Sequence, residues 1–378
     1  MRIASISIVK DEADIIEAFV RHNLLFVDRM FIIDDCSTDN TSEILRRLAL
    51  ENPSVTLFDD GWNGAYHQKK RTTAALKLVR KLEDWDCVLA LDADEFICTD
   101  ARSTFETEIR AITPASPGGF RAVHYCIHPT DDPSIRDPLA RIKHATPVSS
   151  GIFKSFLTRE LLQMEDLAFS DGNHYAIVNG AQIEKSWPLP SVILAHFPVR
   201  SMDQIAIKLL RQYVGWLSRA DYEGHLRMSV KAALALKDEP SFALGHSSKV
   251  FPLYFNFVPN HNDLGERPFN ERQGIVKWPE LAVSPPYAQL MGLLDGWISR
   301  LSAIDHLSMF SGERDQVAAL KRLLGDKSRL HDELWILKHS RVAAGKNFLA
   351  TISAGLMHSW RKHIRAKLSS ATNGSVIN

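Results

Sequence analysis

Short apolar runs alternate with amphipathic stretches over residues 1–100. Apolar runs rich in β-branched residues predict strands, and apolar residues three or four positions apart predict helices. The predicted strands are residues 3–9, 30–33, 55–58 and 87–91, and the predicted helices carry residues 15–24, 44–48 and 68–82. Strands that alternate with helices are typical of a parallel sheet covered by helices, with right-handed connections. The sequence therefore predicts an α/β fold.

The strand at 87–91 leads directly into three acidic residues, Asp92, Asp94 and Glu95. An apolar run of this length predicts a strand buried on both faces. Clustered carboxylates cannot lie unpaired in a core, so we expect them at the carboxyl edge of the sheet. In a fully extended chain Asp92 and Asp94 would share a face, which suits Mg²⁺ or Mn²⁺ bridging phosphates. An acidic loop that caps the next helix is the alternative.

Polar residues also follow the first two predicted strands, with Lys10 and Glu12 after one and Asp34 and Asp35 after the other. The carboxyl ends of parallel strands meet at one edge, where open α/β sheets bind ligands. The sequence has neither the glycine-rich turn of a dinucleotide site nor a P-loop. A nucleotide at this edge would therefore be held by a metal and cationic side chains. For Asp34 and Asp35, a turn that only caps the next helix is the alternative.

Composition narrows the class of protein. Of the 378 residues, 45% are hydrophobic and 24% charged, which describes an ordinary soluble globular protein. Lysine plus arginine and aspartate plus glutamate both number 45, so net charge predicts no nucleic-acid partner. Residues 356–368 carry an apolar stripe flanked by basic residues, a pattern that suits anionic lipid. A helix that closes a bundle with a solvated basic face is the alternative.

The cysteines and the N-terminus bear on the compartment. The four cysteines lack zinc-type spacing, so we expect free thiols in a reducing cytosol. Charge appears by Lys10, too early for the apolar core of a signal peptide. No run approaches the roughly 20 apolar residues of a membrane span. The sequence predicts a cytoplasmic protein and leaves peripheral contact with the inner face of the membrane open.

Three motifs resemble the family 2 glycosyltransferases. They are I-V-K-D-E-A-D at 8–14, I-I-D-D-C-S-T-D-N-T at 32–41 and L-D-A-D-E-F at 91–96. More narrowly, they are similar to the branch with a K-x-E-A first loop and a D-A-D-E-F metal motif. The resemblance extends to about residue 208. It implies a GT-A type fold, with a Rossmann-like, mostly parallel sheet flanked by helices, and transfer of a sugar from a nucleoside diphosphate sugar.

The resemblance also implies roles for residues at the donor side. Asp34 or Asp35 would bind the nucleobase edge or the ribose, and Asp92 the ribose or a metal-bound water. Gln68 and Arg71 would contact the base or the phosphates, although a solvated helical face is the alternative for the basic residues at 69–71. The complete predicted nucleotide-binding set is Lys10, Glu12, Asp34, Asp35, Gln68, Arg71, Asp92 and Arg200.

Downstream, residues 120–127 and 153–157 predict strands, and 128–150 predict a long loop. The turn S-D-G-N-H-Y at 170–175 and a strand that ends in H-F-P-V-R-S at 196–201 resemble the same branch. The resemblance makes His196 a third ligand of Mn²⁺ or Mg²⁺ beside Asp92 and Asp94, with a buried histidine bonded to a backbone carbonyl as the alternative. Arg200 would then bind a phosphate, and Lys208 would assist the leaving group.

An inverting transferase needs a general base near the acceptor hydroxyl. The candidates are Asp171, Glu95 and His174, and Glu165-Asp166 loosely match an acidic pair of the family. The sequence leaves this choice open.

The resemblance implies the first of four parts of the chain, and composition and periodicity indicate the other three. The first part is a GT-A core at 1–208, which has a nucleotide-binding half (1–100) and an acceptor half (101–208). A helical segment rich in aromatic residues and proline follows at 209–290, on the acceptor side. The last two parts are a helical C-terminal extension at 291–368 and a disordered tail at 369–378. The C-terminal helices would pack on one another or on a second subunit, which leaves a homo-oligomer open.

The predicted function is a metal-dependent, inverting glycosyltransferase in cell-surface polysaccharide biosynthesis. Its donor would be a nucleoside diphosphate sugar of the UDP or GDP/dTDP type, and its acceptor a glycan or a lipid-linked molecule. A non-catalytic nucleotide- or glycan-binding module is one alternative. A phosphohydrolase of the haloacid dehalogenase type, in which a strand also ends in D-x-D, is the other. Glu95 argues against the phosphohydrolase, because that class has Thr or Val directly after the second Asp.

Overall fold

The computed structural model describes residues 1–58, 68–183, 186–201, 204–205, 208, 264–269 and 276–282. All of these residues belong to the first of two units, Met1–His306 and Leu307–Asn378. The helical extension predicted at 291–368, its basic stripe at 356–368 and the tail at 369–378 lie outside the described residues. So does most of the predicted segment at 209–290.

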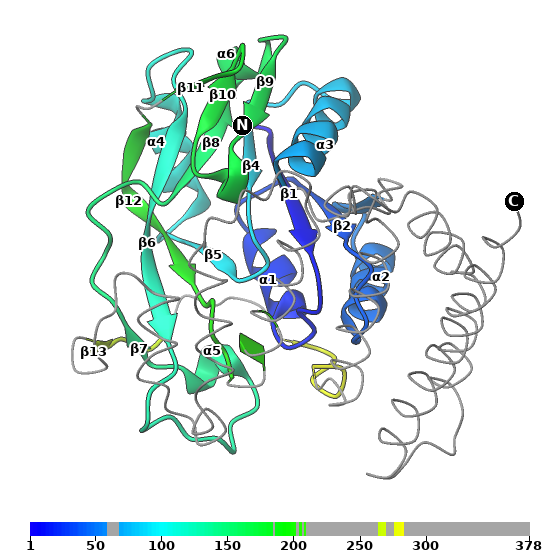
Figure 1. Cartoon of the computed structure of the whole chain (residues 1–378), viewed down its shortest axis with the longest axis vertical. Coiled ribbons are helices and arrows are strands. Elements are labelled where there is room, and N and C mark those ends of the chain that lie inside the picture. Colours follow the sequence, from blue (N-terminus) through cyan, green and yellow to red (C-terminus); the bar gives the residue numbers. More distant parts are fainter. Residues whose placement is uncertain are drawn as a thin grey trace, which may run out of the picture. The chain divides into compact units, whose positions relative to one another are not determined.

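The four apolar runs of the nucleotide half form a parallel sheet. The strands are β1 (Ile3–Val9), β2 (Arg29–Asp34), β3 (Val55–Phe58) and β4 (Cys87–Ala90). β1 pairs with both β2 and β4, and β2 pairs with β3, so the order is β4-β1-β2-β3. The helices that connect them are α1 (Ile16–Asn23), α2 (Thr41–Glu51) and α3 (Gln68–Leu82) (Figure 1). This confirms the predicted α/β fold class.

Alternate residues of each strand point to opposite faces of the sheet. Ile3, Met30 and Leu89 face one core with the apolar residues of α1 and α2. Their neighbours Ala4 and Phe31 face a second core with the apolar residues of α3. The sheet is therefore covered on both faces, which explains why its strands are continuous apolar runs.

The acceptor half extends this sheet with antiparallel and parallel strands. The nucleotide-binding half ends with β5 (Glu95–Cys98). The main elements of the acceptor half are α4 (Arg102–Arg110), β6 (Gly118–Cys126), β8 (Lys154–Thr158) and β12 (Trp187–His196). β8 lies antiparallel between β4 and β6, while β12 runs parallel to β6 and antiparallel to β5. The strands predicted at 120–127 and 153–157 are confirmed as β6 and β8.

Smaller elements complete this half. The predicted loop at 128–150 contains α5 (Pro138–Arg141) and a short strand, β7 (His144–Ala145), which pairs with β13 (Gly265–Glu266). The prediction missed them because each is only two to four residues long. After α6 (Arg159–Leu162) come β9 (Leu167–Phe169), the 3-10 turn η1 (Asp171–Asn173), β10 (Ala176–Val178) and β11 (Ala181–Ile183), and these three strands form a separate antiparallel sheet.

The acidic segment after β4 is a turn and not an extended chain. The Glu95 N–H donates to the Asp92 carbonyl over 3.1 Å. The chain then leaves the parallel sheet as β5, a strand that the periodicity did not predict. Phe96 of β5 is buried among Phe19, Phe197 and Phe269, whose ring centroids lie 5.5 to 6.2 Å away. This packing fixes the backbone on either side of the acids.

Residues 276–282 lie against the nucleotide half. The Trp278 ring packs under the guanidinium groups of Arg21 and Arg47, at 5.1 and 5.6 Å from the ring centroid. The Glu17 carboxylate accepts the backbone N–H groups of Lys277 and Trp278. The prediction assigned 209–290 to the acceptor side, whereas this described part contacts α1 and α2.

Two further expectations can be compared with the structure. All four cysteines are free thiols, as predicted. Within the described residues, no helix is long and apolar enough to cross a membrane.

The core on the acceptor side yields a test of the fold. Phe105 of α4 is fully buried against Phe120 and Phe156, with ring centroids 5.8 and 6.4 Å away. We expect Phe105→Ala to lower the free energy of unfolding by about 3–5 kcal/mol, because it leaves a cavity. Leu50→Ala, at a helical position that is 89% exposed, should change it by less than about 0.5 kcal/mol. Urea denaturation measures both, and equal effects would contradict this packing.

Candidate metal and nucleotide site

The carboxyl ends of the parallel strands meet at one edge of the sheet. Val9 of β1 is in register with Asp34 of β2, and Ile6 with Ala90 of β4. The polar residues that follow these strands therefore gather there, as the sequence predicts. β12 adds a residue from the other half of the chain, because its antiparallel register with β5 places His196 opposite Glu95.

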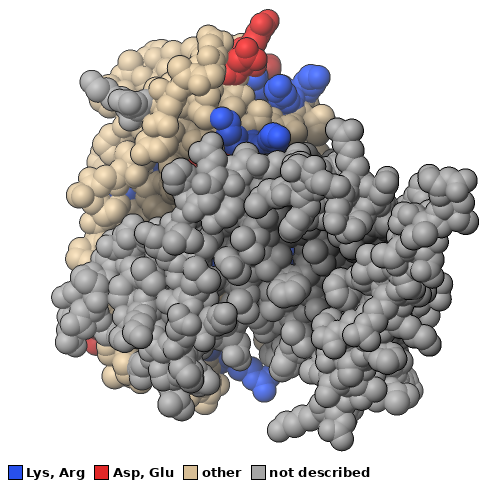
Figure 2. Space-filling view, in the orientation of Figure 1, with Lys and Arg blue, Asp and Glu red and all other residues tan. Residues whose placement is uncertain are grey.

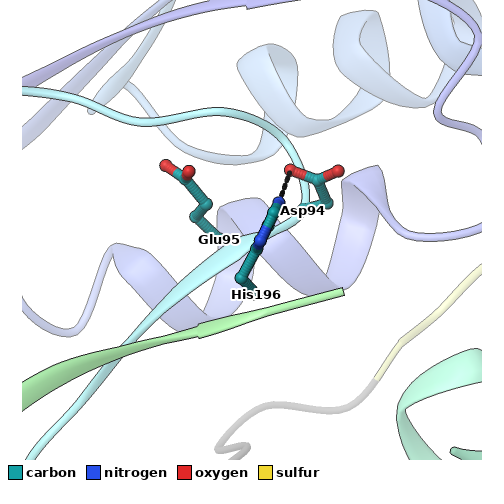
Figure 3. Close-up of side chains that lie close together, drawn as sticks. All are labelled: Asp94, Glu95 and His196. Carbon is teal, nitrogen blue, oxygen red and sulfur yellow. Dashed lines mark ion pairs between the residues drawn. The ribbon is translucent and has the colours of Figure 1, made fainter. Parts of the chain in front are cut away.

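Three side chains at this edge form a group that could hold a metal ion. One ligand atom from each of Asp94, Glu95 and His196 lies within 4.8 Å of the others (Figure 3). His196 Nε2 lies 3.6 Å from Asp94 Oδ1. Two of the three predicted ligands are in the group, but Glu95 stands where Asp92 was predicted. The turn after β4 explains the difference, because Asp92 and Asp94 would share a face only in an extended chain.

The charge states of the group suit a divalent cation. Burial disfavours the Asp94 carboxylate, but Lys208, His196 and Arg200 outweigh it and hold the pKa of Asp94 well below its usual range. Burial lowers the pKa of His196 well below its usual value, so its ring is neutral and keeps a lone pair. Burial raises the pKa of Glu95 to about 8, against the opposing charge of Lys154. Two carboxylates and a neutral imidazole fit Mn²⁺ or Mg²⁺.

A buried lysine, which the sequence analysis did not single out, neutralises two of these acids. Lys154 opens β8 and is only 2% exposed. Its Nζ lies 2.6 Å from Asp92 Oδ2 and 3.1 Å from Glu95 Oε1. Burial would lower the pKa of Lys154, but the two carboxylates raise it above its usual value. A lysine at the start of a predicted strand was the signal available in the sequence.

Gln68 links Asp92 to the turn that carries two candidate bases. Its Nε2 donates to Asp92 Oδ1 over 3.3 Å, and its Oε1 accepts the Gly172 N–H over 3.0 Å. Gly172 has φ +75°, and a Cβ there would lie 2.5 Å from His174 Nε2, so the turn requires glycine. Asp171, in the same turn, is exposed, and its carboxylate accepts the Lys69 N–H over 3.4 Å.

His174 is held in one tautomer. Its Nδ1 donates to the Phe153 carbonyl over 2.5 Å, so in the neutral ring Nε2 carries the lone pair. Burial and then the charge of Lys154 lower the pKa of His174. The ring is therefore neutral near pH 7, with Nε2 as its basic atom.

Arg200 pairs with acids of the first loop. It is 1% exposed, and its guanidinium binds Glu12 and, over 2.7 Å, Asp14. It also lies 3.8 Å from Asp94 Oδ2. Burial raises the pKa of Glu12 to about 7, and Arg200 opposes this shift. Arg200 and Glu12 were both predicted to bind nucleotide, and the structure pairs them with each other.

The two aspartates after β2 differ in what they contact. Both carboxylate oxygens of Asp34 accept hydrogen bonds, from the Ser37 N–H over 3.0 Å and from the Ser42 hydroxyl. Asp34 therefore stabilises the turn, which was the alternative interpretation of this motif. Asp35 forms an ion pair with Arg71 and lies 4.0 Å from Lys10 Nζ.

The basic residues of α3 also differ from one another, because some are exposed to solvent and one is buried. Figure 2 shows Lys and Arg side chains gathered over this helix. Lys69 and Lys70 are exposed, which agrees with a solvated face, while Arg71 is buried against Asp35. Arg71 thus lies at the carboxyl edge of the sheet beside Asp35, whereas Lys69 and Lys70 lie on the protein surface.

Comparisons with known proteins support a glycosyltransferase. Residues 6–102, which include the end of β1, all of β2 to β5 and the three motifs, match the model of the family described as "Glycosyl transferase family 2". No curated protein sequence matches the chain. The resemblance to this family is therefore confirmed for the first part of the chain.

Three solved structures are among those similar to the chain. Mannosyltransferase PcManGT from Pyrobaculum calidifontis, in complex with GDP-Man and Mn²⁺, is 16% identical over 96% of this chain and 88% of its own, with a TM-score of 0.31. TarS of S. aureus is 15% identical over 80% and 55%, with a TM-score of 0.29. Glucosyl-3-phosphoglycerate synthase from Mycobacterium tuberculosis, with Mn²⁺ and UDP, is 15% identical over 42% and 57%, with a TM-score of 0.22.

The buried cation beside the acids yields a stability test. At about pH 9, above the pKa of Glu95, we expect Lys154→Met to lower the free energy of unfolding by about 3–5 kcal/mol, because Asp92 and Glu95 lose their counter-charge. Adding Glu95→Gln should recover part of that loss, since it removes the fully buried carboxylate. Lys77→Met, on the exposed face of α3, should stay within about 0.5 kcal/mol of the parent. Urea denaturation measures all three, and a double variant less stable than Lys154→Met would contradict this account.

Proposed function

We propose that this chain is a metal-dependent glycosyltransferase that moves a sugar from a nucleoside diphosphate sugar to a hydroxyl of a glycan or lipid-linked acceptor. The observation that carries the proposal is the Asp94–Glu95–His196 group at the carboxyl edge of a sheet whose first strands match glycosyl transferase family 2. The resemblance of the motifs supports an inverting reaction in cell-surface polysaccharide biosynthesis.

The side chains of Asp94, Glu95 and His196 would hold Mn²⁺ or Mg²⁺. When bound, a divalent cation there supplies positive charge for the diphosphate that leaves. Asp94 is already ionised and His196 already neutral, so neither must lose a proton first. Glu95 releases its proton on binding, because its pKa of about 8 lies above neutral pH. Lys208, whose Nζ lies 3.0 Å from Asp94 Oδ2, supplies a further cation for the diphosphate.

Asp35 is the better of the two candidates for the nucleobase. Both oxygens of Asp34 are used by the turn. Asp35 retains a partly exposed carboxylate beside Arg71 and Lys10, where an acceptor for a nucleobase N–H stands next to cations for phosphates. Gln68 and Asp92 extend this surface toward the ribose.

Asp171 is the general base that we propose. Glu95 has no exposed surface, so an acceptor hydroxyl cannot reach it. His174 Nε2 packs against Gly172, whereas Asp171 is exposed and its carboxylate accepts one long hydrogen bond. Asp171 would take the proton of the acceptor hydroxyl. The hydroxyl oxygen would at the same time bond to the anomeric carbon of the donor sugar, and the bond from that carbon to the diphosphate would break.

Calorimetry with UDP and GDP tests the donor side. We expect binding of one diphosphate to require Mn²⁺, and Asp94→Asn to weaken it by at least about tenfold, because the firmest anionic ligand is lost. Asp100→Asn, the same substitution at an exposed acid after β5, should bind like the parent chain. Failure of the parent chain to bind either diphosphate, with or without Mn²⁺, would overturn the proposed function. If the chain binds a diphosphate but turns over no donor sugar, the result would favour the alternative of a non-catalytic binding module.

Substitution of Asp171 tests the base. We expect Asp171→Asn to lower the rate of transfer by about 10²–10⁴-fold while diphosphate binding is unchanged, because only proton removal from the acceptor is lost. His174→Gln should have a smaller effect. Donor consumption in the presence of acceptor measures the rate, and full activity of Asp171→Asn would remove it as the base.

A further inference from the structure

A second histidine contacts the proposed metal ligand. His196 at the end of β12 and His124 of β6 are direct partners in the parallel register of these strands. Their Nδ1 atoms lie 2.8 Å apart, with the ring planes at 75°. The function proposed above does not use His124, and the sequence analysis did not single it out.

His124 is held firmly in place. It is 4% exposed, its backbone N–H donates to the Thr146 hydroxyl over 3.1 Å, and its carbonyl accepts the Thr146 N–H over 2.9 Å. The Phe153 ring lies 5.0 Å from each of the two imidazole rings. Backbone and packing thus fix the ring against His196.

A hydrogen bond between two Nδ1 atoms needs one proton and one lone pair. In a pair of neutral imidazole rings, one of the two facing nitrogens carries the proton and the other the lone pair. Two arrangements remain. Either His196 donates from Nδ1 and keeps a lone pair on Nε2, or His124 donates and the His196 proton lies on Nε2.

The two arrangements differ at the atom that faces the carboxylates. His196 Nε2 lies 3.6 Å from Asp94 Oδ1, inside the candidate metal group. Only the first arrangement presents a lone pair there, and a metal ligand must present one. Ligating histidines commonly donate their second ring N–H to a fixed acceptor, which orients the ring and sets its tautomer.

We propose that His124 is a positioning residue of the metal site, which accepts the Nδ1 proton of His196 and so directs the Nε2 lone pair of His196 toward Asp94 and Glu95. The inference rests on the proposed function, because it assumes that a divalent cation binds at this group. His124 acts on the cation only through His196.

Two substitutions separate the hydrogen bond from the packing. In His124→Asn an amide oxygen stands near the position of Nδ1 and can accept the same proton, whereas His124→Leu fills similar space without an acceptor. We expect His124→Leu to bind Mn²⁺ about 10–100-fold more weakly than the parent chain, and His124→Asn to recover most of that loss. His128→Leu, a nearby histidine whose ring stacks on His144, is the control and should bind like the parent.

The measurement is the electron paramagnetic resonance signal of free Mn²⁺ titrated with each full-length variant, beside thermal unfolding without metal. Parent-like binding by His124→Leu would overturn the inference, and so would an Asn variant that folds but binds as weakly as the Leu variant. If His124→Leu does not fold, nitrogen-15 NMR of the Mg²⁺-saturated parent shows which ring nitrogen of His196 carries the proton. A proton on Nδ1 supports the inference, and one on Nε2 overturns it.

The parent chain separates this inference from the proposed function. A parent that binds neither Mn²⁺ nor a nucleoside diphosphate overturns both. A parent that binds both, with no loss in His124→Leu, overturns only the role of His124.

Discussion

Pairing of two buried cations with carboxylates is the constraint on which the site depends. Isolated charges cannot be buried without a partner. Lys154 serves Asp92 and Glu95, and Arg200 serves Glu12 and Asp14. Both cations come from the acceptor half at 101–208, and all four acids come from the nucleotide-binding half at 1–100. The ion pairs therefore join the parallel sheet to the antiparallel extension at the edge where the candidate ligands gather.

The sequence predicts the parts of this arrangement that local pattern determines. Strands β1 to β4 and α3 could be predicted because burial on both faces leaves continuous apolar runs and packing on one face leaves a helical period. The clustering of Asp34, Asp35 and the acids after β4 follows from parallel topology alone. β5 could not be predicted in this way, because its four residues depend on the turn at 92–95 and on pairing with β12, a strand about ninety residues later.

Side-chain partners are the part that residue type does not determine. Asp34 and Asp35 are adjacent and chemically identical, yet one is used by hydrogen bonds within its turn and the other faces two cations. Arg200 has the charge that a phosphate requires, but its guanidinium is occupied by carboxylates. Lys154 was the converse case, a strand residue whose importance appears only once β8 pairs with β4. For Asp35, Arg200 and Lys154 the deciding contact joins elements far apart in the sequence, whereas for Asp34 it is local.

The same neutralisation sets how strongly a metal would be held. Asp94 is buried and ionised because Lys208, His196 and Arg200 surround it. A divalent cation at the group would gain the attraction of Asp94 and Glu95 but would also meet the repulsion of Lys208 and Arg200, so its affinity would be the difference between the two. A diphosphate would supply negative charge to both Lys208 and the divalent cation, and would so offset that repulsion. Metal and diphosphate should therefore bind cooperatively, since each lowers the electrostatic cost of the other.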